Sequence, residues 1–319
     1  MQSDGEFIKF LGEGGFGSVN LVKYTNNDGS SFHAAVKSSY AYNYDHLNRE
    51  FQILSELRGY PRIVRCFGDS LEQGYNPRRR KVYNLLLEYA SEGSLSSFMD
   101  NYIDRKLPES MIRDFTVMIL QGLVIIHSHG YVHCDLKSHN ILVFPSRGSC
   151  SCSYELKIAD FGHALEVGDV PDFWEVDFPF LGTPSYMSPE SLRDGVARKS
   201  LDIWSLGCLV LEMFTGEAPW NGFKTNDLVN RLLDGKAPEI PESVPCDARE
   251  FIEMCFARNP RERGDVYKLL SHRFLDRAQE RTEKIFPVAV SEEEKITSVA
   301  VAEDTGDWLL LDFNLVSVQ

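Results

Sequence analysis

The chain is organised around Tyr131-Val-His-Cys-Asp-Leu-Lys-Ser-His-Asn-Ile-Leu-Val143, in which an acid, a cation and an amide lie within six positions. These are Asp135, Lys137 and Asn140, with apolar residues on both sides. The pattern predicts a short polar loop between two buried, strand-like segments. A carboxylate can orient a hydroxyl nucleophile, an ammonium can neutralise a transferring phosphoryl group, and an amide oxygen can bind magnesium. A loop without catalytic function can hold the same residue types, so this stretch alone leaves both interpretations open.

The composition narrows the class of protein. The chain has 319 residues, of which 43% are hydrophobic. That is enough for a large core and for about two domains of ~100–200 residues each. No apolar run reaches the roughly 18 residues of a membrane span, and residues 1–6 lack the basic and apolar segments of a secretory signal. The net charge of −14 argues against nucleic acid, and against an anionic membrane, as the main partner.

The cysteines and one cluster of cations indicate the cellular compartment of the protein. The chain holds seven scattered cysteines, at 66, 134, 150, 152, 208, 246 and 255. An odd, scattered set favours reduced thiols in a protein of the cytoplasm, and also of the nucleus, over a disulfide framework. Cys150 and Cys152 are spaced like a metal-binding pair, but no nearby histidine or second pair completes four ligands, so solvated thiols are preferred. The four cations of 78–81 resemble a nuclear-import patch, although an exposed turn is the favoured interpretation.

The N-terminal part contains a glycine-rich segment, Leu11-Gly-Glu-Gly-Gly-Phe-Gly-Ser-Val19. Gly12, Gly14 and Gly17 match G-x-G-x-x-G, and such glycines let backbone amides approach phosphate oxygens. A tight hairpin without a ligand is about as good an explanation of the motif alone. A dinucleotide-binding fold needs a helix after the last glycine, whereas a strand is expected at 18–22. A β-hairpin that covers a nucleotide is therefore preferred.

A lysine and a glutamate follow in the next two expected elements. Lys37 ends an apolar strand at 32–37, where an unpaired ammonium is expensive to bury. Glu50 lies beside the apolar stripe of a helix expected at 47–57, from which it can face Lys37 across a cleft. A surface lysine and a solvated glutamate are the alternatives. Further strands are expected at 63–67 and 82–89, and a buried helix at 111–128.

Several motifs together resemble the eukaryotic protein kinases. H-C-D-L-K-x-x-N at 133–140 is similar to the catalytic loop of that family, and 32–37 is similar to its V-A-I-K strand. Ala159-Asp-Phe-Gly162 matches the D-F-G element, and Gly182-Thr-Pro-Ser-Tyr-Met-Ser-Pro-Glu190 resembles the segment that docks substrate in serine/threonine kinases. The motifs stand in the family's order, and within the family they look like the small MEKK-like MAP kinase kinase kinases of plants.

The resemblance implies an α+β, two-lobed protein-kinase fold. It predicts a β-rich N-lobe at about 7–90, an α-rich C-lobe at about 91–276, and an acidic tail at 277–319. ATP and Mg²⁺ are the implied cofactors, with Asn140 and Asp160 as metal ligands. Catalytic roles fall to Asp135, Lys137, Lys37, Glu50 and Thr183, where Thr183 bridges Asp135 and Lys137. The implied nucleotide-binding residues are Leu11, Gly12, Gly14, Gly17, Val19, Lys37 and, from the hinge after Leu87, Glu88 and Ala90.

The same resemblance assigns supporting roles. Asp202, near the start of a helix at 201–212, is expected to brace the backbone of the catalytic loop. Glu190 is expected to pair with Arg263 beneath the substrate platform. His133 is predicted to be a packed core residue and not a base. A last helix at 266–275 is expected to close the domain.

Two departures from the family concern regulation. Cys134 stands where most of these kinases carry an arginine, which normally pairs with a phosphorylated residue of the activation loop. The loop itself, His163 through Leu181, contains no serine, threonine, tyrosine, lysine or arginine, but it holds five acids and four aromatic residues. We hypothesise that aromatic packing holds this loop without a phosphate. The acids favour a substrate with basic residues, although a solvated loop explains them equally well.

The predicted function is transfer of the ATP γ-phosphoryl group to serine or threonine of protein substrates. As a MAP kinase kinase kinase, the protein would phosphorylate MAP kinase kinases in a stress or hormone cascade, and it is expected to be a monomer. A pseudokinase scaffold and a small-molecule phosphotransferase are the alternatives. The tail, which includes Asp307-Trp-Leu-Leu-Leu-Asp-Phe313, is interpreted either as a docking segment for a regulator or as a segment that packs on the kinase.

Overall fold

The computed structural model describes residues 5–14, 17–26, 28–76, 79–146, 153–171 and 182–276. All of them lie in the first of two units of the chain, Met1–Ile285. The second unit, Phe286–Gln319, lies outside the described residues, and so does the whole predicted tail at 277–319.

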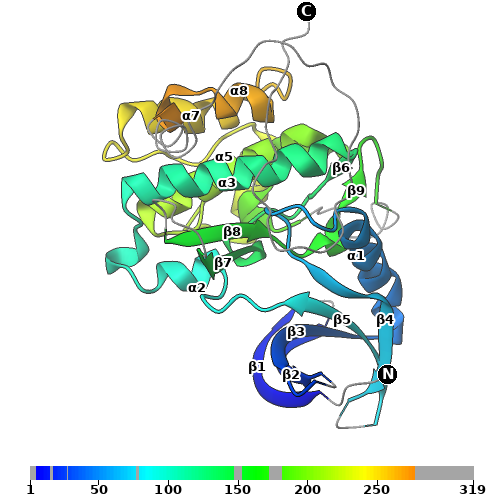
Figure 1. Ribbon diagram of the computed structural model, residues 1–319. Coiled ribbons are helices and arrows are strands. Elements are labelled where there is room, and N and C mark those ends of the chain that lie inside the picture. The colour runs from blue at the N-terminus through cyan, green and yellow to red at the C-terminus, as the bar shows by residue number, and fades with distance from the viewer. Residues whose placement is uncertain are drawn as a thin grey trace, which may run out of the picture. The chain divides into compact units, whose positions relative to one another are not determined.

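The N-lobe is built on an antiparallel sheet, which contains five strands among the described residues (Figure 1). The strands, in their spatial order, are β1 (Glu6–Gly14), β2 (Gly17–Thr25), β3 (Ser31–Tyr40), β5 (Lys81–Glu88) and β4 (Cys66–Tyr75). β2 begins at Gly17, the last motif glycine of the glycine-rich segment, and pairs with β1, so the predicted hairpin is confirmed. Val19 is the register partner of Lys37 across β2 and β3, and this pairing places the hairpin next to the lysine.

The expectation of a strand at 63–67 was only partly right. β4 begins at Cys66, whereas Ile63 forms an isolated parallel bridge with Ile158. The Val64 N–H donates to the Ile158 carbonyl (2.9 Å), and the Ile158 N–H donates to the Arg62 carbonyl (2.9 Å). The backbone groups of the short segment around Ile63 are therefore satisfied by Ile158, in the strand that leads to Asp160, and not by the N-lobe sheet.

Helix α1 (Tyr44–Glu56) packs against the sheet, in agreement with the helix expected at 47–57. Its buried stripe consists of Leu47, Ile53, Leu54 and, unusually for a charged residue, Glu50. The same helix contacts the 3₁₀ turn η4 (Phe161–His163), which directly follows Asp160. α1 therefore brings Glu50 toward both the sheet and the D-F-G element.

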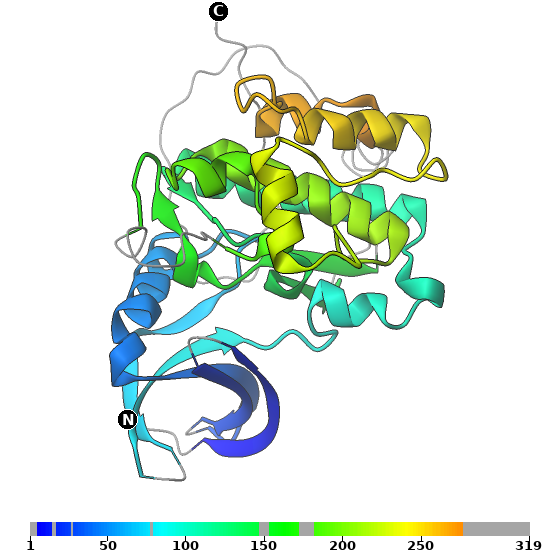
Figure 2. The same ribbon diagram turned by 180° about the vertical axis from the view of Figure 1, so that it is seen from behind.

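The C-lobe is helical, and α3 (Glu109–Ser128) and α5 (Lys199–Thr215) lie side by side in it (Figures 1 and 2). Among the residues that the structure describes, the other C-lobe helices are α2 (Leu95–Met99), α4 (Pro189–Arg193), α6 (Thr225–Leu233), α7 (Cys246–Cys255) and α8 (Val266–Leu270). The chain also forms 3₁₀ turns η1 (Ala41–Asn43), η2 (Ile103–Arg105), η3 (Ser138–Asn140), η5 (Pro184–Tyr186) and η6 (Arg273–Leu275).

Two expectations for the C-lobe helices met different outcomes. α3 confirms the buried helix expected at 111–128, and although its length and apolarity would suit a membrane span, it lies mostly buried in the core. The prediction of a single last helix at 266–275 is wrong, because α8 ends at Leu270 and a 3₁₀ turn, η6, follows. The His272 ring nitrogen Nδ1 accepts a hydrogen bond from the Phe274 N–H (3.2 Å), which starts a new turn instead of continuing the helix.

Two small strand pairs hold the polar loop of residues 133–140. β6 (Tyr131–Val132) pairs with β9 (Leu165–Glu166), and β7 (Ile141–Pro145) pairs with β8 (Tyr154–Ile158). β6 leads into the loop and β7 leaves it, as the apolar flanks predicted. β8 ends just before Asp160, so one hairpin fixes both Asn140 and Asp160.

Candidate active site

Asp135 lies at the centre of a ring of hydrogen-bond donors, although its carboxylate is buried. The Thr183 hydroxyl donates to Oδ1 (2.7 Å), and the Lys137 ammonium donates to Oδ2 (2.7 Å). Lys137 Nζ also donates to Thr183 Oγ1 (2.8 Å), so Thr183 bridges the two side chains as predicted. Asn140 Nδ2 completes the ring with a bond to Asp135 Oδ2 (3.1 Å). The three groups of the polar loop therefore act as one constellation.

The catalytic loop is fixed from below by Asp202, in the first turn of α5. Its carboxylate accepts hydrogen bonds from the backbone N–H groups of His133 (2.9 Å) and Cys134 (3.0 Å). His133 is fully buried, its Nε2 lies 3.0 Å from the Ala159 carbonyl, and its ring packs edge-on against Phe161. The predicted brace and the predicted packing of His133 are both confirmed.

A second cluster joins Lys37, Glu50 and Asp160. Lys37 Nζ donates to Glu50 Oε2 (2.6 Å) and to Asp160 Oδ1 (2.7 Å). Glu50 is 1% exposed, so neither a surface lysine nor a solvated glutamate describes this pair. The structure thus brings together residues from β3, α1 and the segment after β8.

The electrostatics of this cluster keep the ammonium charged. Burial alone would lower the pKa of Lys37, but the carboxylates of Glu50 and Asp160 raise it above its usual value. Burial would likewise raise the pKa of Asp160, but Lys37 beside it holds that pKa well below the usual range. For Glu50, burial raises the pKa and Lys37 acts against it. A cation held between two carboxylates suits the recognition of phosphate groups in a low-dielectric cleft.

The three motif glycines do not have the same structural role. Gly17 has φ +146°, and an added Cβ would lie 2.0 Å from the Ser38 carbonyl oxygen, so the sheet itself requires glycine there. An added Cβ at Gly12 or Gly14 meets no atom within 4 Å among the described residues. The fold therefore does not explain Gly12 and Gly14, and the open space beside them is consistent with a ligand that approaches the backbone.

The predicted hinge residues follow β5. The Glu88 carboxylate accepts from Lys157 Nζ at both oxygens (2.7 and 2.9 Å) and from the Arg65 N–H (2.7 Å). Because these bonds occupy the Glu88 carboxylate, the base of a bound nucleotide would contact the main chain of Glu88 and Ala90. Leu87, just before them, is buried and pairs with Ala35 of β3.

The donor set at the loop fits magnesium. Asn140 Nδ2 is bound to Asp135, to its carbonyl oxygen (2.8 Å) and to Oδ2, which leaves the amide oxygen Oδ1 as the atom that can bind a metal. Asp160 supplies a carboxylate on a residue in the left-handed conformation (φ 65°). Mg²⁺ prefers such hard oxygen ligands and needs only one or two from the protein. No group of three or more histidine, cysteine or acidic residues forms a metal cage among the described residues, while Cys150 and Cys152 lie outside them.

Cys134 packs in an apolar cluster and not in a charged pocket. The members of the cluster are all buried: Val132, Cys134, Leu165, Ala197 and Leu201. Burial raises the pKa of the Cys134 thiol well above its usual value, so the thiol is a packing group and not a reactive one. The Gly168 N–H donates to the Ala197 carbonyl (2.9 Å) and ties the start of the activation loop to the C-lobe. Residues 172–181 lie outside the described residues, and with them the predicted aromatic packing.

The predicted ion pair between Glu190 and Arg263 is confirmed, whereas a second buried acid of the C-lobe was missed. Arg263 donates to Glu190 through both terminal guanidinium nitrogens, one of them at 2.9 Å, as expected. Glu212 received no role, although it accepts hydrogen bonds from Ser138 and Tyr186 beneath the site. The only signal in the sequence was an acid in the otherwise apolar end of a helix, which does not name its partners.

The comparisons with known proteins agree with this geometry. The model of the protein kinase domain family matches residues 6–275. Mitogen-activated protein kinase kinase kinase 20 of Arabidopsis thaliana is 36% identical over 296 residues, which cover 90% of this chain and 82% of the relative. Mitogen-activated protein kinase kinase kinase 18 of the same plant is 36% identical, with 82% and 75% covered.

Mitogen-activated protein kinase kinase kinase 3 of Arabidopsis thaliana is 34% identical, and the match covers 84% of this chain but only 42% of that relative. The likeness therefore centres on the catalytic domain. Together with the geometry of Lys37, Asp135 and Asp160, the matches decide the family: the chain belongs to the protein kinases and is a serine/threonine kinase that resembles the plant mitogen-activated protein kinase kinase kinases.

Proposed function

We propose that this protein transfers the γ-phosphoryl group of magnesium-ATP to a serine or threonine of a MAP kinase kinase. The observation that carries the proposal is the assembly of two clusters, Lys37 with Glu50 and Asp160, and Asp135 with Lys137 and Thr183. Each group expected of a phosphoryl-transfer site stands within hydrogen-bond distance of its partner.

Each residue then has a task in the reaction. The nucleotide and its magnesium supply the phosphoryl group and part of the charge compensation. Lys37, held by Glu50, offers an ammonium to phosphate oxygens, while Asn140 and Asp160 offer the oxygens that hold the metal. Asp135 orients the acceptor hydroxyl and accepts its proton late in the transfer, and Lys137 stabilises charge that develops on the transferred group.

Nucleotide recognition completes the proposal. The backbone of Gly12 and Gly14 covers the phosphates, and Leu11 and Val19 enclose the base from the hairpin. Gly17 contributes through the shape of that hairpin. The main chain of Glu88 and Ala90 reads the edge of adenine.

The acceptor class is supported by the names of the relatives, which are mitogen-activated protein kinase kinase kinases. Such a protein acts on MAP kinase kinases in a signalling cascade, which we take to be a stress or hormone cascade. We further propose that the protein is a monomer of the cytoplasm, with access to the nucleus, and that its tail docks a regulator. No observation favours a pseudokinase scaffold, because the described site holds each reacting group that the family motifs require.

The experiment is phosphoryl transfer by the purified protein to itself, to a generic basic protein and to a panel of inactive MAP kinase kinases. Wild type is compared with Asp135→Asn, which keeps the shape of the side chain but removes the base. Transfer is expected to fall by about 10²–10⁴-fold in the variant, while ATP binding persists. Transfer to the basic protein but to no MAP kinase kinase would restrict the conclusion to kinase activity, and ATP binding without any transfer would overturn it.

A further inference from the structure

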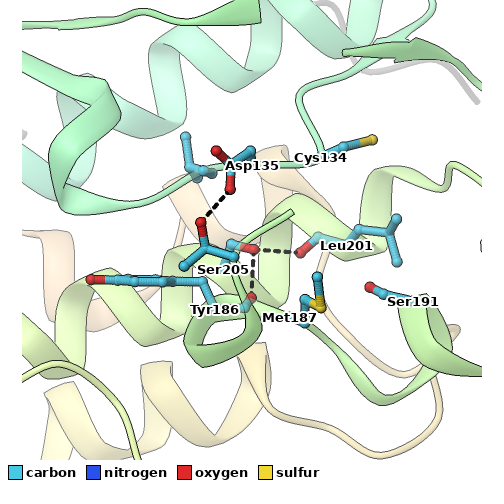
Figure 3. Close-up of a pocket in the computed structure, with 9 residues that line it drawn as sticks. Cys134, Asp135, Tyr186, Met187, Ser191, Leu201 and Ser205 are labelled. Carbon is cyan, nitrogen blue, oxygen red and sulfur yellow. Dashed lines mark hydrogen bonds between the residues drawn. The ribbon is translucent and has the colours of Figure 1, made fainter. Parts of the chain in front are cut away.

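A cavity beneath the active site is too small to be a second ligand site. Figure 3 shows it between Asp135, Cys134, Tyr186 and Ser205, and its volume of about 10 Å³ suits a group no larger than one water molecule. A larger hollow, of about 320 Å³, lies elsewhere in the C-lobe. Because ligand pockets have volumes from ~300 Å³ upward, this second hollow is large enough to accept a side chain of a partner.

The hollow lies between helix α7 and the segment that follows α6. Positions 249, 253 and 256 are four and three residues apart, so they lie on one side of α7 and its C-cap. The opposite side of α7 faces the core with Ala248, Phe251, Ile252 and Cys255, all buried. The hollow therefore uses the outer side of the helix, and the residues that line it are Ala237, Pro238, Ile240, Arg249, Glu253 and Phe256.

The wall opposite α7 is held in a fixed shape. Pro238, Pro241 and Pro245 restrict the backbone of the segment that joins α6 to α7. The Arg249 guanidinium of α7 donates to the Ile240 carbonyl (3.1 Å) and to the Pro241 carbonyl (2.6 Å), so it ties this segment to the helix. A hollow with preformed walls binds a partner without the entropy cost of ordering those walls.

The charge that the hollow offers to a partner is negative. Arg249 is occupied by the two carbonyls, whereas the exposed Glu253 carboxylate has no hydrogen bond or ion pair among the described residues. Segment 234–245 adds three acids and only one lysine. Apolar lining beside an available carboxylate fits an apolar side chain that is followed or preceded by a basic residue.

The hollow is connected to the part of the C-lobe that takes the acceptor. α6 contacts α4 and the turn η5, which both contain residues of the substrate-docking segment 182–190. Beneath the hollow, the Phe256 ring packs against Trp204 (centroids 4.9 Å apart), and the Arg263 guanidinium that pairs with Glu190 lies over the same Trp204 ring (4.9 Å). Since α6 has nine residues and is thus about 13 Å long, a protein bound at Asp135 is wide enough to reach the hollow as well.

We propose that this hollow is a docking pocket for the protein acceptor, which inserts an apolar side chain there while Glu253 pairs with an adjacent lysine or arginine. The inference rests on the proposed transfer to protein acceptors and adds a contact away from the reacting atoms. Such a contact holds the acceptor equally in the ground state and in the transition state. It therefore lowers the KM for the protein acceptor and leaves kcat unchanged.

The test compares a whole protein acceptor with a short peptide, using the full kinase chain. The whole acceptor is a generic basic protein in which basic and apolar residues adjoin, and the peptide contains only the residues around its phosphorylated site. Glu253→Gln removes the charge and Ala237→Phe fills the hollow, and both positions are exposed, so both variants should fold. Each should raise the KM for the whole protein by about tenfold, with kcat, the KM for ATP and the KM for the peptide unchanged.

Two matched variants control for charge and bulk. Glu217→Gln removes the same charge from an exposed acid of the C-lobe, and Ser243→Phe adds bulk to an exposed position of the same segment. Neither residue lines the hollow, so both variants are expected to behave as wild type. An unchanged KM for the whole protein, an equal loss with the peptide, or an equal loss in the controls would overturn the inference. Melting temperatures identify unfolded variants, which Glu253→Ala and Ala237→Leu then replace.

The wild type itself separates this inference from the proposed function. A KM for the whole protein that is no lower than the KM for the peptide would overturn the docking pocket and leave the proposed function intact. Failure of the wild type to phosphorylate any protein or peptide would count against the proposed function and remove the basis of the docking pocket with it.

Discussion

Lys37 stands between two carboxylates, and its removal therefore has consequences that depend on pH. The lowered pKa of Asp160 contributes stability above its unfolded pKa of about 3.9 that is lost as the pH falls. The raised pKa of Lys37 contributes stability below its unfolded pKa of about 10.4 that is lost as the pH rises through the folded value. The two ion pairs of Lys37 therefore stabilise the folded state most between about pH 3.9 and about pH 10.4.

Lys37→Met is expected to abolish phosphoryl transfer and to lower the free energy of unfolding by ~2 kcal/mol at pH 7, a value reduced because Asp160 is one-third exposed. The difference from wild type should shrink toward pH 4, since protonation relieves the repulsion between Glu50 and Asp160. Urea unfolding at several pH values measures this. A difference that stays constant from pH 7 to pH 4 would contradict the assigned contacts.

The motif glycines allow a matched pair of variants. Gly17→Ala should cost roughly 1–3 kcal/mol of stability because φ is +146° and the Cβ would collide with the Ser38 carbonyl. Gly14→Ala meets open space, so it should unfold like wild type but raise the KM for ATP. Thermal unfolding and steady-state kinetics separate the two effects. If Gly14→Ala leaves the KM unchanged, the assignment of that glycine to the nucleotide fails.

At the scale of elements, the start of the activation loop is held by packing. β9 pairs with β6, and Leu165 of β9 shares an apolar cluster with Cys134 and with Leu201 of α5. A kinase loop that depends on phosphate needs a cation at the position of Cys134 and a hydroxyl in the loop, and the sequence lacks both. The described apolar contacts hold the start of the loop in place of a pair between a phosphate and a cation.

We expect phosphatase treatment to leave kcat/KM unchanged, because 163–181 holds no serine, threonine or tyrosine. A large loss of activity on dephosphorylation would contradict the hypothesis. Cys134→Arg tests the hypothesis only indirectly, because it also changes the packing of a buried position. Because Cys134 is buried among apolar residues, an unpaired arginine there should lower stability by about 3 kcal/mol or more, with Cys134→Ala as the milder control.

At the scale of the whole molecule, the described elements and the family match both end before the tail. The family match ends at 275 and the last described element, η6, ends at Leu275. Removal of 277–319 should therefore leave the melting temperature and the transfer to a generic protein within about twofold of wild type. Loss of binding to a specific partner alone would support the docking role of the tail. A truncated chain that does not fold would instead favour packing of the tail on the kinase.

Local patterns in the sequence correctly predicted several secondary-structure elements. The β1–β2 hairpin, α1 and α3 followed from alternation and helical periodicity, because these patterns depend on neighbours within a few residues. The family motifs added the order of the catalytic groups. The local rules failed where backbone groups had alternatives: the segment around Ile63 pairs with β8, and His272 interrupts the helix expected at 266–275.

Some pairings of buried polar groups became visible in the tertiary structure alone. Lys37 and Asp160 are 123 positions apart, and Ser138 and Glu212 are 74 apart, so no local pattern pairs them. The structure also separated Gly17, required by the sheet, from Gly12 and Gly14, which the fold does not require. The physical reason is that a buried charge or hydroxyl must be satisfied by a partner in space, and packing of the whole chain chooses that partner.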